Sequence, residues 1–169
     1  VRRQRQMCIR DRYASNGVGM LFLPEVDDEV VLQFINEDPC HPVIIGSLYS
    51  RKRKTPVSLD PKNNLKTIVT KNQLKITLDD DKKIITIGTP GENTLILDDD
   101  KKQILLSDAN KNKVCMDKNG IMVESGKDLI FKARGNVKTE GMGIESKSKQ
   151  DTKINGLNIE VSAQMGVKV

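Results

Sequence analysis

Leu78-Asp79-Asp80-Asp81-Lys82-Lys83-Ile84 recurs as Leu97-Asp98-Asp99-Asp100-Lys101-Lys102-Gln103-Ile104, and more weakly as Met116-Asp117-Lys118-Asn119-Gly120-Ile121. The first aspartate advances by 19 residues at each step, which indicates a repeat architecture. Each unit reads as a strand, a polar turn and a second strand. The apolar residues alternate through Leu74, Ile76 and Leu78, then Ile85 and Ile87, and again through Leu95, Leu97, Ile104 and Leu106. This alternation predicts strands with one face toward a core and the other toward water.

From residue 121 the apolar period shortens to eight residues, and Gly126, Gly135, Gly141 and Gly143 punctuate the turns. The inward positions predicted from this period are Ile121, Val123, Leu129, Phe131, Val137, Leu157, Ile159 and Val161. Eight residues are too few for a closed coil made by a single chain, so the strands are expected to pack against other copies. An intertwined homotrimer, in which each chain supplies one wall of a prism, would also remove the exposed sheet edges.

The region before the repeats also reads as strands. Val30–Ile35 and Val43–Tyr49 are apolar runs, and the Asn36–Pro39 stretch between them has turn chemistry. Short strands joined by tight polar turns predict a small β-barrel over 13–50. The basic, proline-containing stretch 51–64 is predicted to be a linker, and 65–169 the repeat region.

The composition favours thin layers of strands and argues against a thick globular core. Aromatic residues make up 3% of the 169 residues, with no Trp, while 37% are hydrophobic and 30% charged. The net charge of +5 arises mainly in residues 1–12, which hold five arginines and one aspartate. This segment is predicted to be non-native and adapter-derived; a basic N-terminal arm is the alternative. Without it the chain is close to neutral, which removes most of the case for a polyanionic partner.

Candidate chemical sites are few, and each has a structural interpretation that we favour. His41 is the only histidine, and no partner stands at a recognisable catalytic spacing. The Asp79–Asp81 and Asp98–Asp100 clusters could bind Ca²⁺, but two lysines follow each, as expected of solvated turns. Arg51–Lys54 lacks interleaved aromatic residues for stacking on nucleic acid. The three cysteines form no metal or disulfide pattern, and no apolar run would span a bilayer.

The 17–50 region resembles the OB-fold domain of VgrG proteins and phage central spike proteins. The resemblance rests on Gly17-Val18-Gly19-Met20, Pro24-Glu25-Val26, Asp28-Glu29-Val30, Phe34, Asp38-Pro39, Pro42-Val43-Ile44 and Gly46-Ser47-Leu48-Tyr49. The residues expected to shape this domain are Gly17, Gly19, Pro24, Glu25, Asp28, Asp38, Pro39, Gly46 and Tyr49. The resemblance implies an all-β chain: the C-terminal part of an OB-fold, then a triple-stranded β-helix or β-prism needle in a homotrimer. We expect a C-terminal fragment, without the preceding hub domain and truncated in mid-repeat.

The resemblance implies a mechanical part with no enzymatic activity, catalytic residue, metal or cofactor. It would be made in the bacterial cytoplasm and secreted or injected at the tip of a contractile tail, phage-like or type VI. Implied partners are two further copies of the chain, the tail tube or an Hcp-like protein, a PAAR-like cap or effector, and transiently the target membrane. No specific nucleic acid is expected. The alternative functions are a β-prism adhesin or saccharide-binding or saccharide-cleaving tail module and, less favoured, a nucleic-acid-binding OB protein.

Overall fold

The computed structural model describes residues 8–9 and 14–162, and the regular structure among them is strands, with one 3-10 turn and no α-helix. The chain divides into two compact units, 1–129 and 130–169. Within the first unit, three separate sheets form. They contain three, two and seven strands. The all-β fold class predicted from the sequence is confirmed.

The first sheet is built around β4 (Val30–Phe34) and β5 (Pro42–Ser47), which pair antiparallel. The strand β1 (Cys8–Ile9) adds in parallel to β5, so two residues of the segment predicted to be adapter-derived are paired here. The rest of that segment lies outside the described residues. A bulge interrupts the β4–β5 ladder where Val31 faces Gly46 and Leu32 faces Ile44. The short hairpin β2 (Ala14–Ser15) and β3 (Val18–Gly19) forms the two-stranded sheet.

Two expected strand ends differ from the structure. Ile35 was predicted to continue the first strand, but it begins a 3-10 turn, η2 (Ile35–Glu37), in which Asn36 has a φ of 53°. The reason is the tight connection that follows, because the Ile35 N–H donates to the carbonyl of His41 at 3.1 Å. The second strand ends at Ser47 and not at Tyr49. Leu48 beyond it keeps one backbone bond, from its N–H to the Glu29 carbonyl at 2.8 Å.

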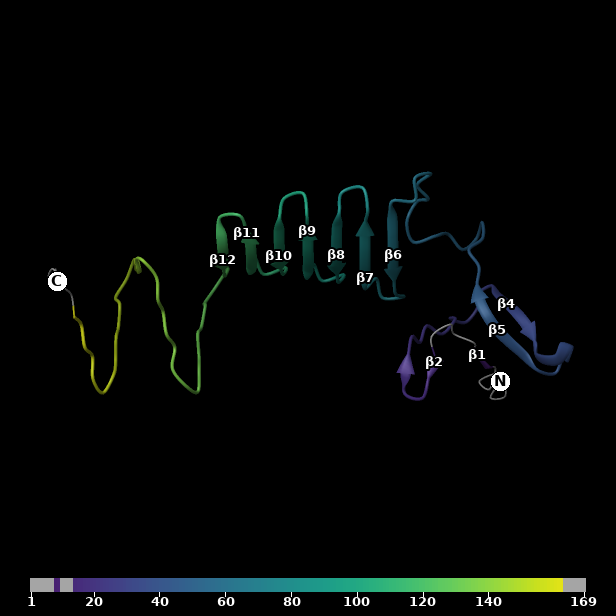
Figure 1. Cartoon of the computed structure of the whole chain (residues 1–169), viewed down its shortest axis with the longest axis horizontal. Coiled ribbons are helices and arrows are strands. Elements are labelled where there is room, and N and C mark those ends of the chain that lie inside the picture. Colours follow the sequence, from purple (N-terminus) through teal and green to yellow (C-terminus); the bar gives the residue numbers. More distant parts are fainter. Residues whose placement is uncertain (1–7, 10–13, 163–169) are drawn as a thin grey trace. The chain divides into compact units, whose positions relative to one another are not determined.

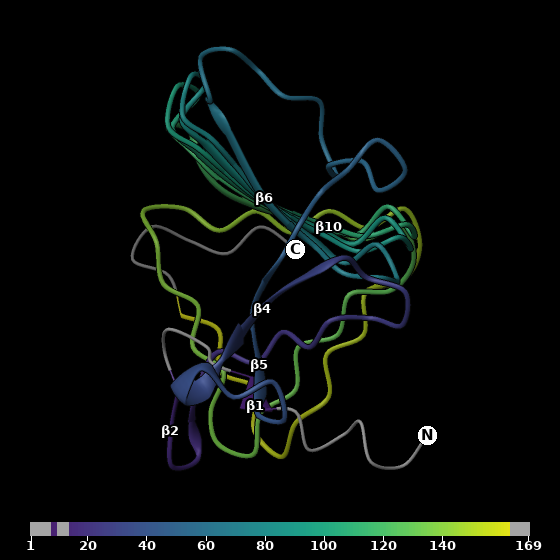
Figure 2. The same cartoon turned by 90° about the vertical axis from the view of Figure 1, so that its right-hand side faces the viewer.

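The third sheet is a single layer of seven antiparallel strands in sequence order (Figure 1). We call it the long sheet. Its strands are β6 (Leu65–Val69), β7 (Lys75–Asp79), β8 (Ile84–Gly88), β9 (Thr94–Asp98), β10 (Gln103–Ser107), β11 (Lys113–Asp117) and β12 (Gly120–Glu124). Seen end-on, successive strands lie almost behind one another (Figure 2). Each strand pairs with the next through a tight turn, so the predicted 19-residue repeat corresponds to two strands and two turns.

The turns of the long sheet repeat in their backbone conformation. The loops 70–74, 89–93 and 108–112 each place their fourth residue in the left-handed region. These residues are Gln73, Glu92 and Lys111, with φ of 63°, 62° and 67°. The shorter loops at the opposite ends of the strands also have a left-handed residue, Lys83 and Lys102, with φ of 53° and 50°. L-residues other than Gly occupy this region at a cost of roughly 1–2 kcal/mol. The repeat therefore stores a small strain at the same point of each hairpin.

Replacing a left-handed residue by glycine is expected to relieve that strain. Glu92→Gly should raise the stability of each chain by about 0.5–1 kcal/mol, because Gly adopts a positive φ without steric cost. Lys82→Gly is the matched control in a loop residue of ordinary φ, and it should lower stability by a similar amount. Thermal unfolding followed by circular dichroism measures both. Equal effects of the two changes would contradict the role assigned to the left-handed position.

The second unit contains no strand among its described residues, 130–162. The sequence predicts strands at the eight-residue period there, and the single chain does not form them. The backbone runs as an open zigzag (Figure 1), and every described side chain in it is exposed. A strand needs a hydrogen-bonded neighbour, and this stretch has none among the residues that the structure describes.

Candidate functional site: an assembly surface

Two rows of cross-strand neighbours cover one face of the long sheet. One row is Lys66, Leu78, Ile85, Leu97, Ile104, Met116 and Ile121, and the other is Ile68, Ile76, Ile87, Leu95, Leu106, Val114 and Val123. Within each strand the two positions are separated by one residue, so both rows point to the same side. Apart from Lys66, every position is Ile, Leu, Val or Met. We call this side the apolar face.

The apolar face is uncovered in the single chain. Ile87 is 42% exposed, Leu97 37% and Leu106 53%. Among the described residues no side chain is fully buried, and of the hydrophobic ones only Val43 and Cys115 are less than a tenth exposed. Nothing among the described residues therefore covers this face.

The opposite face of the long sheet is mixed. Its central row begins with Thr67, Thr77 and Thr86 and continues as Ile96, Leu105, Cys115 and Met122. One flanking row is polar from Thr94 onward, and cross-strand neighbours within it bond to one another. Thr94 and Ser107 share a hydrogen bond of 2.7 Å, and Lys113 pairs with Glu124 at 2.9 Å. These polar partners distinguish the mixed face from the apolar face.

The end of the apolar face is closed by the segment that follows β12. Leu129 joins Leu106, Val114 and Val123 in lining a recess of about 450 Å³. The Asn112 side-chain oxygen holds this segment by accepting from the Ser125 hydroxyl at 2.9 Å and the Gly126 N–H at 3.1 Å. A Cβ on Gly126 would lie 2.5 Å from the Asn110 carbonyl oxygen, so the close approach requires glycine. The predicted turn glycine at 126 thus has a packing reason.

The predicted inward residues fall into two groups. Ile121 and Val123 lie on the apolar face of β12, where they are 72% and 47% exposed. Leu129, Phe131, Val137, Leu157, Ile159 and Val161 lie beyond the last strand, all at least half exposed. The apolar-face residues of β7–β10 are those whose alternation in the 19-residue repeat predicts a core-facing side, although they were not named in the trimer-core set.

The predicted OB-domain residues are distributed over turns and strand ends. Gly17 has a φ of 71° in the β2–β3 turn, and Gly19 a φ of 149° in β3. Pro24 precedes the turn that Glu25 and Asp28 close, Asp38 and Pro39 lie in the β4–β5 connection, Gly46 lies at the bulge, and Tyr49 follows β5. The structure gives each a backbone or turn position, and none lies in a cavity with catalytic side chains.

The sole histidine is part of a turn. The Asp38 carboxylate accepts from the Cys40 N–H at 2.9 Å and lies 2.8 Å from the His41 ring nitrogen Nδ1. The Cys40 N–H first, and His41 second, hold the pKa of Asp38 below its usual value. Both side chains are exposed, as in a turn. Among residues 8–9 and 14–162, no three His, Cys, Asp or Glu side chains are grouped so as to hold a metal ion.

The repeated aspartates close the hairpins of the long sheet. Asp98, whose side chain is 4% exposed, accepts from the Lys101 N–H at 2.9 Å and pairs with the Lys101 ammonium at 3.2 Å. The Lys101 N–H is the main reason that the pKa of Asp98 lies below its usual value. Asp79 repeats the backbone bond, from the Lys82 N–H at 3.0 Å. Asp108 has a lowered pKa mainly through the Asn112 side chain.

These turn carboxylates predict acid sensitivity. Since the folded-state pKa values of Asp38, Asp98 and Asp108 are lowered, their stabilising effect is present above the unfolded value of about 3.9 and is lost as pH falls through the folded values. The melting temperature should be flat from pH 7 to pH 5 and fall below about pH 4. Asp98→Asn should lower it at pH 7 and reduce the fall. An identical fall in this variant would contradict the assignment.

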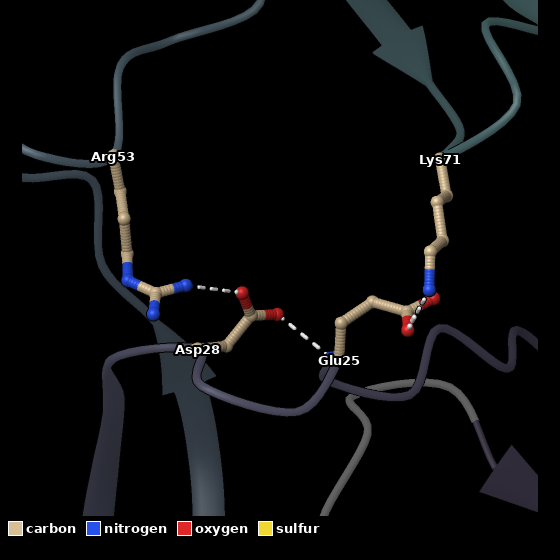
Figure 3. Close-up of polar contacts among 4 residues, drawn as sticks. All are labelled: Glu25, Asp28, Arg53 and Lys71. Atoms are coloured by element: carbon tan, nitrogen blue, oxygen red, sulfur yellow. Dashed lines mark hydrogen bonds and ion pairs between the residues drawn. The ribbon is translucent and has the colours of Figure 1, made fainter.

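The connector 51–64 is tied to the OB region by an ion pair. The Arg53 guanidinium donates to Asp28 Oδ1 at 2.8 Å, and Lys71 in the β6–β7 loop pairs with Glu25 at 3.2 Å (Figure 3). The sequence predicted a linker here and gave no sign of either pair, because the partners are 25 and 46 residues apart.

Among the described residues, no helix is long and apolar enough to cross a bilayer.

Two known protein families match the chain, one in the OB region and one in the repeat region. The family described as the type VI secretion system/phage-baseplate injector OB domain matches residues 8–49, which hold β1–β5. The phage baseplate V C-terminal trimerisation domain matches residues 83–140, from the start of β8 to beyond the last strand. No curated protein matches the chain. Both families are structural domains, and the second supports a homotrimer. On these two matches the chain is similar to VgrG-like and phage-baseplate spike proteins, and the matches support a structural component of a baseplate.

Proposed function

We propose that this chain forms the needle of a homotrimeric spike at the tip of a contractile injection machine. The observation that carries the proposal is the uncovered apolar face of the long sheet, next to a match to a trimerisation domain. Three copies facing a common axis would bury three such faces against one another. Covering the remaining two-fifths of one Ile or Leu side chain contributes on the order of 1 kcal/mol, and each copy has about a dozen of them.

The same assembly would give partners to the stretch beyond β12. The match to the trimerisation domain continues through residue 140, past the last strand at Glu124 and into the second unit. We infer that the chain pairs with itself up to β12 and with neighbouring copies after it. The apolar positions of this second part, such as Phe131 and Val137, would then turn toward the axis. Trimer formation and strand formation are coupled in this part of the needle.

A closed trimer of this kind suits mechanical work on an envelope. With the apolar faces inside, the outer surface would be the mixed face, whose Thr, Asp and Lys side chains reduce the apolar area that could retain lipid. Interchain backbone hydrogen bonds would make unfolding slow, and slow unfolding is what resists a transient load. We infer that sheath contraction drives the needle through the target envelope, with the OB domain toward the tail tube and a cap or effector carried at the distal end.

Localisation on assembled particles tests this proposal. Epitope-tagged chain should co-purify with contractile particles, and gold-labelled antibody should mark one end of the tube by electron microscopy. Ile87→Asp should remove the label while leaving the sheath and tube assembled without a needle, whereas Thr86→Asp on the mixed face should retain it. Label along the sheath, or particles of full potency in the absence of this chain, would refute a role at the tip.

A further inference from the structure

An acidic turn and a basic connector meet in the first unit of the chain. Residues 25–29 contain four acidic side chains, and 51–54 are all basic. The turn is closed in both directions, because the Asp28 N–H donates to the Glu25 carbonyl at 3.1 Å and the Glu25 N–H donates to Asp28 Oδ2 at 2.8 Å. One carboxylate oxygen of Asp28 thereby holds the turn, which leaves the other oxygen for a partner outside it.

The outside partner is the connector. Arg53 Nη1 donates to Asp28 Oδ1 at 2.8 Å, and both side chains are only about one-third exposed, at 35% and 34%. The backbone of Arg53 is fixed as well, since it exchanges hydrogen bonds of 2.9 and 3.1 Å with Ser50. Such a charge-assisted bond between two groups that are already ordered needs little further loss of side-chain freedom. The Asp28–Arg53 pair is therefore the stronger of the two ion pairs in this contact.

A second pair reaches the long sheet itself. Glu25 Oε2 lies 3.2 Å from the ammonium of Lys71, which belongs to the loop between β6 and β7 (Figure 3). Both side chains are well exposed, at 59% and 74%, so solvent and salt weaken this pair. The one turn at 25–28 therefore holds the chain at two points. One point is the connector that leaves the OB region, and the other is the first hairpin of the long sheet.

We propose that Glu25, Asp28, Arg53 and Lys71 form an electrostatic clamp that fixes where the needle leaves the OB domain. Without the clamp, the run Arg51–Lys54 would be a self-repelling, flexible tether between the two parts. With the clamp, the acidic side chains of residues 25–29 offset the positive charge of Arg51–Lys54, and Asp28 holds Arg53 in place. Because the contacts are ionic and solvent reaches them, the joint opens with rising salt while both domains stay folded. The clamp would keep force directed along the needle during contraction, and it does not depend on the identity of the cargo.

Asp28→Asn separates the clamp from the turn. The asparagine keeps one side-chain oxygen to accept from the Glu25 N–H, but its amide group offers no acceptor to the Arg53 guanidinium. Asp27→Asn is the matched control, because Asp27 is adjacent, acidic and in no ion pair among the described residues. Its φ of 73° is also one that Asn adopts readily. Lys71→Gln removes the second pair on a side chain too exposed to affect folding.

The experiment measures trypsin cleavage within 51–54 in the full chain, followed by mass spectrometry at 50 and 500 mM NaCl. Rates are normalised to a free peptide of residues 48–58. At low salt, Asp28→Asn should be cut about three- to tenfold faster than the wild type, and Lys71→Gln about twofold faster. Asp27→Asn should match the wild type. High salt should accelerate cleavage of the wild type more than that of Asp28→Asn.

Hydrogen exchange in the same variants distinguishes a joint from a folding defect. Amides of β4, β5 and the long sheet should exchange in Asp28→Asn as in the wild type, with faster exchange confined to the connector. Equal cleavage of Asp28→Asn and Asp27→Asn would overturn the proposal. So would a wild-type rate that does not change with salt, or faster exchange throughout β4 and β5, which would make Asp28 a support of the OB domain instead of a clamp.

Discussion

Ile87→Asp should convert the trimer into single chains. Ile87 is the fourth of the five residues of β8, and its cross-strand neighbours on the apolar face are Ile76 and Leu95. In the proposed trimer its three copies meet around the axis, and the only cation in either row is Lys66, on the edge strand β6. An unpaired carboxylate buried in such a place costs several kcal/mol, and the trimer would contain three.

Thr86→Asp is the control for this prediction. Thr86 is the preceding residue of the same strand, so its side chain lies on the mixed face between Thr77 and Ile96. The new carboxylate would stay in water, and the cost is limited to strand propensity, up to about 1 kcal/mol per chain. Size-exclusion chromatography with light scattering should give three chains for this variant and one for Ile87→Asp. Trimers of Ile87→Asp, or monomers of both, would contradict the assignment of the faces.

Amides in residues 128–162 should be strongly protected from hydrogen exchange in the trimer and unprotected in a single chain. Within one chain these residues form no strand, so their N–H groups have no ladder to join. In the trimer each strand would gain neighbours on both sides. We expect exchange at least about a thousandfold slower there than in dissociated Ile87→Asp, since opening then requires breaking the assembly.

The interior position Val137 and its neighbour Lys138 give a local version of this test. Val137→Asp should abolish protection across the stretch, because three carboxylates would meet where the eight-residue period places an inward side chain. Lys138→Asp changes the next residue, which that period turns outward, and should leave protection intact. Fast exchange of residues 128–162 in an intact wild-type trimer would show that the needle ends at β12, and the intertwined part of the account would fail.

The sequence was sufficient for the repeat and for its faces. Asp79, Asp98 and Asp117 recur every 19 residues because each closes a hairpin at the same step, and the apolar positions between them alternate as a half-buried strand requires. Local patterns of this kind can be read directly, since neighbouring strands are joined by tight turns. The register follows as well, because a one-residue slip would turn Ile87 and Leu95 to the mixed face.

Other features depend on contacts that no local pattern encodes. Ile35 reads as strand, yet the bond to His41 curls it into a 3-10 turn. The pairing of Arg53 with Asp28 brings together two parts of the chain that look like a turn and a linker when read separately. The strands expected after residue 125 are absent from the single chain for a different reason. Their pattern specifies an apolar side, and in the proposed trimer their partners would belong to other copies.

The mass of the assembled chain tests the central claim most directly. Multi-angle light scattering of the full chain, with an unboiled SDS gel alongside, would report both the number of copies and the resistance of the assembly to dissociation. The account predicts a single species of three times the 18.9 kDa chain mass, which falls to one chain only on boiling. A folded, monodisperse species of one chain mass would mean that something other than two further copies covers the apolar face, and the trimeric needle would be wrong.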